Sequence, residues 1–198
     1  MAVSYNKSNM EIGIWGDSII YGAGDTMALG WVGRLRKLLE KDEDISVYNF
    51  GVCGDTTNDL AKRFLVEADS IKPNVVIFAI GINDSKYPVG ETASNVPLES
   101  YKQNMRELVK LARKYTDKIH IVGATKVDET SMRESGTRFV NDTIQSYNNF
   151  LKEFSESEGL LYVDVFDVLD IHTDLDDGLH PNAQGYEKLF NTIQEFVK

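Results

Sequence analysis

The 198-residue sequence contains a single cysteine, Cys53, and no apolar run long enough to cross a membrane. One cysteine cannot form an internal disulfide or a multi-cysteine metal site. The longest apolar run lies near Val75–Ile80, far short of the roughly 20 residues that a transmembrane helix requires. Residues 1–7 also lack the apolar core of a signal peptide. These absences predict a cytoplasmic protein, unless a leader has been removed from the sequence.

Positive charge is scarce as well. The 21 lysines and arginines are outnumbered by 31 acidic residues, which gives a formal net charge of −10. The basic residues are scattered, as is typical of solvated helix faces, and they form no patch in the sequence. Because such a charge repels nucleic acid and anionic lipid, we expect neither nucleic-acid binding nor stable membrane association.

What is present is the composition of an ordinary globular protein, with 42% hydrophobic and 26% charged residues. A chain of this length can bury roughly 70% of its unfolded surface, so its core needs no disulfide or metal. Neither a linker nor an internal repeat interrupts the sequence. We therefore expect a single domain over residues 1–198.

Short apolar runs rich in β-branched residues alternate with apolar residues at helical spacing along the whole chain. Runs of this kind are typical of parallel strands that are covered on both faces. The predicted strands are Glu11–Trp15, Ile45–Asn49, Val75–Ile80, Ile119–Gly123 and Leu160–Val163. The helical patterns begin at Val32, Leu60, Tyr101, Phe139 and Ala183. The alternation predicts an α/β fold, in which an open parallel sheet carries helices on both faces.

Polar motifs follow the first three predicted strands, which is where open parallel sheets bind their ligands. The motifs are Gly16-Asp17-Ser18, Gly51–Thr56 and Gly81–Asp84. The connections at about 84–97 and 124–136 are longer than the usual ~2–6 residues. We expect these two connections to wall a ligand crevice, with plain surface insertions as the alternative.

Ser18 is a candidate nucleophile, although a serine after a strand is more often a helix cap. A serine attacks a carbonyl only if a base takes its proton. Of the three histidines, His120 lies within a predicted strand and His172 in an acidic stretch. His180 lies three residues after Asp177 in a loop that ends at a proline. This spacing can place the carboxylate beside the imidazole, where it would fix the ring's tautomer.

Acyl transfer also needs hydrogen-bond donors for the oxyanion that develops on the carbonyl. Gly54 suits this role because a residue without Cβ lets a ligand approach the backbone N–H. Asn83 offers a side-chain amide, and the N–H of Ser18 is a third donor. A turn glycine and a turn asparagine are the ordinary interpretations. The coincidence of nucleophile, donors and acid–base pair in one chain favours the catalytic interpretation.

These residues carry a resemblance to the SGNH, or GDSL-type, hydrolase family. The family's four blocks are similar to Gly16-Asp17-Ser18, Gly54, Gly81-x-Asn83-Asp84 and Asp177-x-x-His180, which occur in the same order here. The segments 49–56 and 177–186 carry the match further, and 177–186 is its most specific part. Ile19, where the family has leucine, is a conservative departure.

The resemblance implies a three-layer α/β/α, flavodoxin-like fold with a five-stranded parallel sheet. It also implies esterase or lipase chemistry without a metal or cofactor. Ser18 would be the nucleophile, His180 the base and Asp177 its partner. The oxyanion hole would consist of the Ser18 N–H, the Gly54 N–H and the Asn83 side chain.

Several rival interpretations are weaker. A dinucleotide fingerprint would need glycine where Met27 stands, and Ser18 has no Gly-x-Ser-x-Gly elbow. The acidic stretch 164–177 lacks the spacing of a calcium loop. Cys53 as a thiol nucleophile and a non-catalytic binding module on the same fold remain alternatives. A buried filler residue is the ordinary interpretation of such a cysteine.

The expected substrate is a small-molecule ester with a short acyl chain, such as an O-acetyl group, because the negative charge disfavours lipid surfaces. Lysophospholipids and acyl thioesters are alternatives that the family also covers. Asp17, Tyr87, Val89 and Met132 are candidate substrate-binding residues. Packing of the loops is the alternative role for those that lie in the long connections.

Overall fold

A computed structural model describes residues 9–131 and 136–197. Its five strands are β1 (Met10–Gly16), β2 (Ile45–Gly51), β3 (Val75–Ala79), β4 (Ile119–Val122) and β5 (Leu161–Val163). All neighbouring strands pair in parallel, in the order β2-β1-β3-β4-β5. The predicted α/β fold with a five-stranded parallel sheet is confirmed, and each predicted strand matches an observed one closely.

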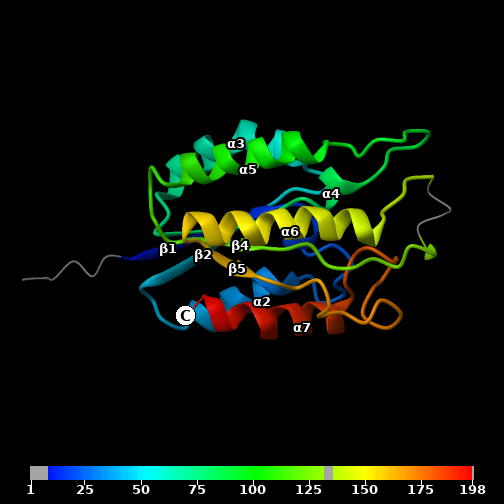
Figure 1. Cartoon of the computed structure of the whole chain (residues 1–198). Helices are drawn as coiled ribbons and strands as arrows, with labels where there is room; N and C mark the ends of the chain where they lie inside the picture. Colours follow the sequence, from blue (N-terminus) through cyan, green and yellow to red (C-terminus); the bar gives the residue numbers. More distant parts are fainter. Residues whose placement is uncertain (1–8, 132–135, 198) are drawn as a thin grey trace, which may run out of the picture.

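Helices cover both faces of the sheet (Figure 1). One layer contains α2 (Gly30–Leu39) and α7 (Ala183–Ile193). The opposite layer contains α3 (Thr57–Ile71), α5 (Leu98–Ala112) and α6 (Asn141–Glu158). Three short elements complete the described chain: α1 (Ser18–Tyr21), α4 (Ile82–Ser85) and the 3-10 helix η2 (Gln194–Phe196). In this part of the chain, no helix has both the length and the apolarity to cross a membrane.

The fourth predicted helix starts later than its apolar pattern indicates. Phe139 and Val140 were expected within it, but α6 begins at Asn141. Val140 has extended backbone angles, with φ −128° and ψ 120°. Phe139 is buried nonetheless. Its side chain packs in the core from the loop that precedes α6 and not from the helix itself.

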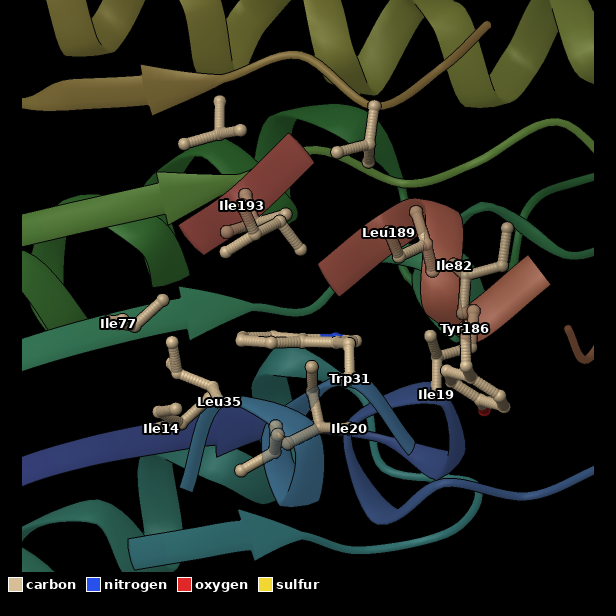
Figure 2. Packing of buried hydrophobic residues seen from close by; sticks show 14 of the residues in the cluster. Ile14, Ile19, Ile20, Trp31, Leu35, Ile77, Ile82, Tyr186, Leu189 and Ile193 are labelled. Atoms are coloured by element: carbon tan, nitrogen blue, oxygen red, sulfur yellow. The ribbon is translucent and has the colours of Figure 1, made fainter. Parts of the chain in front are cut away.

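The apolar core on the α2 and α7 side anchors the short helix α1. Figure 2 shows Trp31 of α2 lying flat among the side chains of strands and α7. Ile19 and Ile20 of α1 join this cluster and are 9% and 1% exposed. Because two of its four residues are buried in the core, α1 is fixed in orientation, and with it Ser18 at its first position.

The strand order reverses beside β1, which has β2 on one side and β3 on the other. In open α/β sheets, the carboxyl ends of the strands at such a switch point form the ligand-binding crevice. The motifs that begin at Gly16, Gly51 and Gly81 all lie at this edge, since they end or follow β1, β2 and β3. The fold therefore brings the three sequence motifs together.

Candidate active site

Ser18 opens the one-turn helix that follows β1. Gly16 is the last strand residue, and Asp17 is the helix N-cap, with its carboxylate accepting a hydrogen bond from the Ile19 N–H at 2.9 Å. Ser18 is 6% exposed. Its position at the carboxyl end of the sheet is the one that the sequence predicts for a nucleophile.

His180 reaches Ser18 from the loop before α7, although 162 residues separate them. The distance between Ser18 Oγ and His180 Nε2 is 2.9 Å, and that between His180 Nδ1 and Asp177 Oδ2 is 2.7 Å. A carboxylate that accepts from Nδ1–H leaves Nε2 as the acceptor for the serine hydroxyl. The three side chains therefore form one continuous hydrogen-bonded chain with the polarity that a serine nucleophile needs.

The carboxylate of Asp177 is held in its charged form. Burial would raise its pKa, but hydrogen bonds from the His180 backbone and ring and from the Leu179 N–H lower that pKa below its usual value. Oδ1 accepts both backbone N–H groups, at 2.8 Å and 3.0 Å, while Oδ2 faces the ring. An anion at this position stabilises the imidazolium that forms when His180 takes a proton.

Gly178 lets the loop of Asp177 pack closely against the connection after β4. Its φ of +84° favours glycine, and a Cβ there would lie 2.6 Å from the Ser131 side chain. The Asp128 N–H donates to the Gly178 carbonyl at 2.8 Å. The long connection after β4 thus contacts the Asp177 loop directly. The sequence of this connection does not predict that contact.

Two of the three predicted oxyanion donors, Gly54 and Asn83, follow the carboxyl ends of β2 and β3. Gly54 has φ +86°, and apart from Gly54 and its two chain neighbours no described residue has an atom within 4 Å of the position that a Cβ would take there. Asn83 lies in α4 and is 5% exposed. Its Nδ2 donates to the Asp55 carbonyl at 3.1 Å, and its Oδ1 accepts from Lys86 Nζ at 3.4 Å. The amide carries two hydrogens, so the same nitrogen can also donate to an oxyanion.

Two buried carboxyls lie just behind the site. Burial raises the pKa of Asp17 to about 7; the Ile19 N–H opposes the rise, and the charges of Asp84 and Asp55 add to it. Burial also raises the pKa of Asp84 to about 6, against hydrogen bonds from the hydroxyl and N–H of Thr57. Asp17 is 2% exposed. Its burial and its capping bond favour a structural role over the substrate binding that we expected for it.

We expect Asp17→Asn to stabilise the fold at alkaline pH. Between the usual pKa of 3.8 and about 7, the folded chain binds more protons at this carboxyl than the unfolded chain does. Stability from this group therefore falls as pH rises through that window and is lowest above it. The asparagine oxygen can still cap α1. At pH 8 the variant lacks the buried charge, and its free energy of unfolding should therefore exceed that of the parent by up to about 4 kcal/mol.

Urea unfolding of both chains at pH 4 and pH 8 measures this gain. The difference should be near zero at pH 4, where the carboxyl is protonated in the folded state. Because the charge of Asp84 raises the pKa of Asp17, the gain at pH 8 includes relief of the repulsion between these two carboxylates. A difference of equal size at both pH values would contradict the titration of Asp17.

The two long connections are joined to each other. Tyr87 and Arg138 form an antiparallel bridge, with N–H···O distances of 2.7 Å and 3.0 Å. The Arg138 guanidinium lies 4.9 Å from the centre of the Tyr87 ring, and the Tyr87 hydroxyl is 2.9 Å from Thr143 Oγ1. These contacts assign Tyr87 a packing role between the loops. Val89 is 68% exposed, and Met132 lies outside the described residues.

The other candidate nucleophile, Cys53, and the other two histidines do not take part in the hydrogen-bonded chain of Ser18, His180 and Asp177. Cys53 is exposed, so the expectation that it fills buried space is wrong. The loop of Gly51–Thr56 turns its side chain outward instead of into the core. Burial lowers the pKa of His120 within β4. His172 is exposed, and its N–H donates to Asp170. The ring that reaches Ser18 is that of His180.

Sequence reasoning missed two residues that contact the site. Lys86 donates to the Asn83 amide oxygen, and Arg63 of α3 donates to the Gly16 carbonyl and to Asp55. The only signal for Arg63 in the sequence is its place between Leu60 and Phe64, beside the buried stripe of a predicted helix. A basic residue at such a position is more often a solvated side chain.

Three comparisons place the chain among known proteins. The model of the GDSL-like Lipase/Acylhydrolase family matches residues 14–188. A multidomain esterase of Ruminococcus flavefaciens is 26% identical over 163 residues, which are 81% of this chain and 17% of that protein.

Solved structures share the fold. A catalytic mutant of an acetylxylan esterase from Geobacillus stearothermophilus superposes with a TM-score of 0.78 at 23% identity, over 95% of this chain and 94% of the other. The lipase/acylhydrolase of Enterococcus faecalis superposes with a TM-score of 0.80 at 22% identity, over 95% of both chains.

Proposed function

Since the chain belongs to the GDSL-like lipase/acylhydrolase family and is thus an ester-bond hydrolase, we propose that it cleaves short-chain acyl esters through an acyl-enzyme on Ser18. The observation that carries the mechanism is the hydrogen-bonded chain Ser18–His180–Asp177 at the carboxyl edge of the sheet. Gly54 and Asn83 lie at the same edge. These are the parts that an acyl transfer to serine requires.

In the proposed reaction, Ser18 Oγ attacks the ester carbonyl while His180 Nε2 takes its proton. Asp177 holds the Nδ1–H tautomer and stabilises the imidazolium. The negative charge that develops on the carbonyl oxygen is bound by the N–H groups of Ser18 and Gly54 and by the Asn83 amide. His180 then protonates the leaving alcohol, and water releases the acid from Ser18 by the reverse sequence.

Two observations support a short acyl group, in particular O-acetyl on a carbohydrate. The structural neighbour from Geobacillus stearothermophilus is an acetylxylan esterase. The net charge of −10 disfavours adsorption to the anionic lipid surfaces on which long-chain esters lie. Proteins that share a fold differ in their substrates, so the acyl preference must be measured on this chain.

Hydrolysis of p-nitrophenyl esters from acetyl to decanoyl tests the proposal. We expect kcat/KM to be highest for acetyl and to fall at least about tenfold by decanoyl, since a methylene that a short acyl site cannot accommodate costs ~1–3 kcal/mol of transition-state binding. Release of acetate from acetylated xylooligosaccharides is the matching assay on sugar esters. A maximum at long chains would overturn the short-chain proposal in favour of lysophospholipid or thioester substrates.

A further inference from the structure

The guanidinium of Arg63 connects two segments of the site. Its Nη2 donates to the carbonyl of Gly16, two residues before Ser18, at 3.0 Å. Its Nε donates to Asp55 Oδ2, in the residue after Gly54, at 2.7 Å. We propose that Arg63 is a positioning residue that sets the spacing between the Ser18 and Gly54 donors of the oxyanion hole. This inference rests on the proposed function of the site.

Arg63 is itself held from behind. Its Nη1 donates to Glu67 Oε2 at 2.7 Å, and the same oxygen accepts the indole N–H of Trp15 at 2.9 Å. Trp15 is fully buried and stacks on Phe50, with ring centres 4.9 Å apart. The guanidinium is thus fixed by the aromatic core of the α3 side of the sheet. A mobile surface arginine has no such support.

The network extends to the third donor. The Asp55 carbonyl accepts the Asn83 amide at 3.1 Å, while the Asp55 carboxylate pairs with Arg63. The Gly16 carbonyl also accepts the Val52 N–H at 3.1 Å, which ties β1 to the loop of Gly54. One guanidinium therefore contacts the backbone before Ser18 and the residue that joins Gly54 to Asn83.

If Arg63 positions the oxyanion donors, its replacement should lower kcat as well as the stability of the fold. Oxyanion donors act only when they lie within hydrogen-bond distance of the transition-state oxygen, and misplacement by about 1 Å can cost ~100-fold in rate. The ground-state ester gains little from these donors, so KM should change less than kcat. Arginine is required because its planar fork reaches two acceptors at fixed angles, whereas lysine presents a single point charge.

The test compares Arg63→Met, Arg63→Lys and the control Arg113→Met. Like Arg63, Arg113 donates to both a carboxylate and a backbone carbonyl, here those of Glu158, at 2.7 Å and 3.0 Å. It caps α5 at the opposite end of the sheet from Ser18. Kinetics on p-nitrophenyl acetate are measured well below the midpoint of thermal unfolding of each variant. Labelling of Ser18 by a fluorophosphonate probe is followed in parallel.

We expect Arg63→Met to lower kcat by about 10- to 100-fold with KM within about threefold of the parent, and to slow labelling similarly. Arg63→Lys should recover part of this loss, and Arg113→Met should stay within about twofold of the parent. An Arg63→Met variant with a lower unfolding midpoint but the parent kcat would overturn the inference while leaving the proposed function intact. A parent chain that neither hydrolyses esters nor reacts with the probe would overturn the proposed function and this inference with it.

Discussion

Replacing Ser18 with alanine is expected to lower kcat toward p-nitrophenyl acetate by about 10⁴-fold or more, because the attacking oxygen is lost. The residual rate would come from binding and from the oxyanion donors acting on water. The variant should fold normally, since the one side-chain hydrogen bond that the structure shows for Ser18, to His180 at 2.9 Å, has a net value of only ~1 kcal/mol. Initial rates and thermal unfolding measure both effects.

Ser146→Ala is the matched control for this change. Ser146 is exposed on α6, where its hydroxyl donates to the carbonyl of Asp142. The control should keep the parent rate and remain labelled by the fluorophosphonate probe, whereas Ser18→Ala should lose the label. An Ser18→Ala variant with the parent rate would show that the chemistry uses another nucleophile. Cys53, which is exposed beside Gly54, would then be the residue to replace next.

Replacing His180 with alanine is expected to cost about as much as replacing Ser18, again about 10⁴-fold or more in kcat. Without the imidazole, no group takes the proton from Ser18 Oγ or returns it to the leaving alcohol. Because the two residues act as one unit, the double variant Ser18→Ala with His180→Ala should be no slower than either single variant. Steady-state kinetics on the three variants measure this lack of additivity.

His172→Ala controls for the loss of an imidazole from the same loop. His172 is exposed, eight residues before His180 in the sequence, and should be replaceable without loss of rate. Two single variants whose losses multiply in the double variant would mean that Ser18 and His180 act independently. That result would contradict the hydrogen-bonded chain as the source of the activity.

The fold could be predicted because its strands are marked by nearly continuous apolar runs. A strand such as β3 is buried on both faces, so its residues leave few alternatives to a parallel sheet. The pairing of Asp177 with His180 could also be predicted, since three residues suffice to bring the side chains together in a turn. The contact of His180 with Ser18 depends instead on the packing of α7 beside α2. The coincidence of the motifs in one chain and the resemblance to a family both indicate it.

The support of the site could not be predicted, for physical reasons that differ between residues. Arg63 contacts the Ser18 segment through the backbone carbonyl of Gly16, and a backbone acceptor leaves no trace in the sequence of the segment that supplies it. Asp17 is a predicted substrate-binding residue, but its carboxylate caps α1 and is buried, and that burial depends on tertiary packing that the motif does not encode. For Tyr87 the sequence leaves two roles open, substrate binding or packing of the loops. The bridge from Tyr87 to Arg138 depends on where two long loops meet, which local patterns do not encode.

The two ends of the described chain both lie at the amino edge of the sheet. Figure 1 shows β1 starting and α7 ending on the left, while the carboxyl ends of the strands and α4 lie on the right. A polypeptide or a solid support joined at either described end would therefore lie at the edge of the sheet opposite Ser18. Attachment of the chain to a surface through these ends is therefore expected to leave the edge that carries Ser18 uncovered.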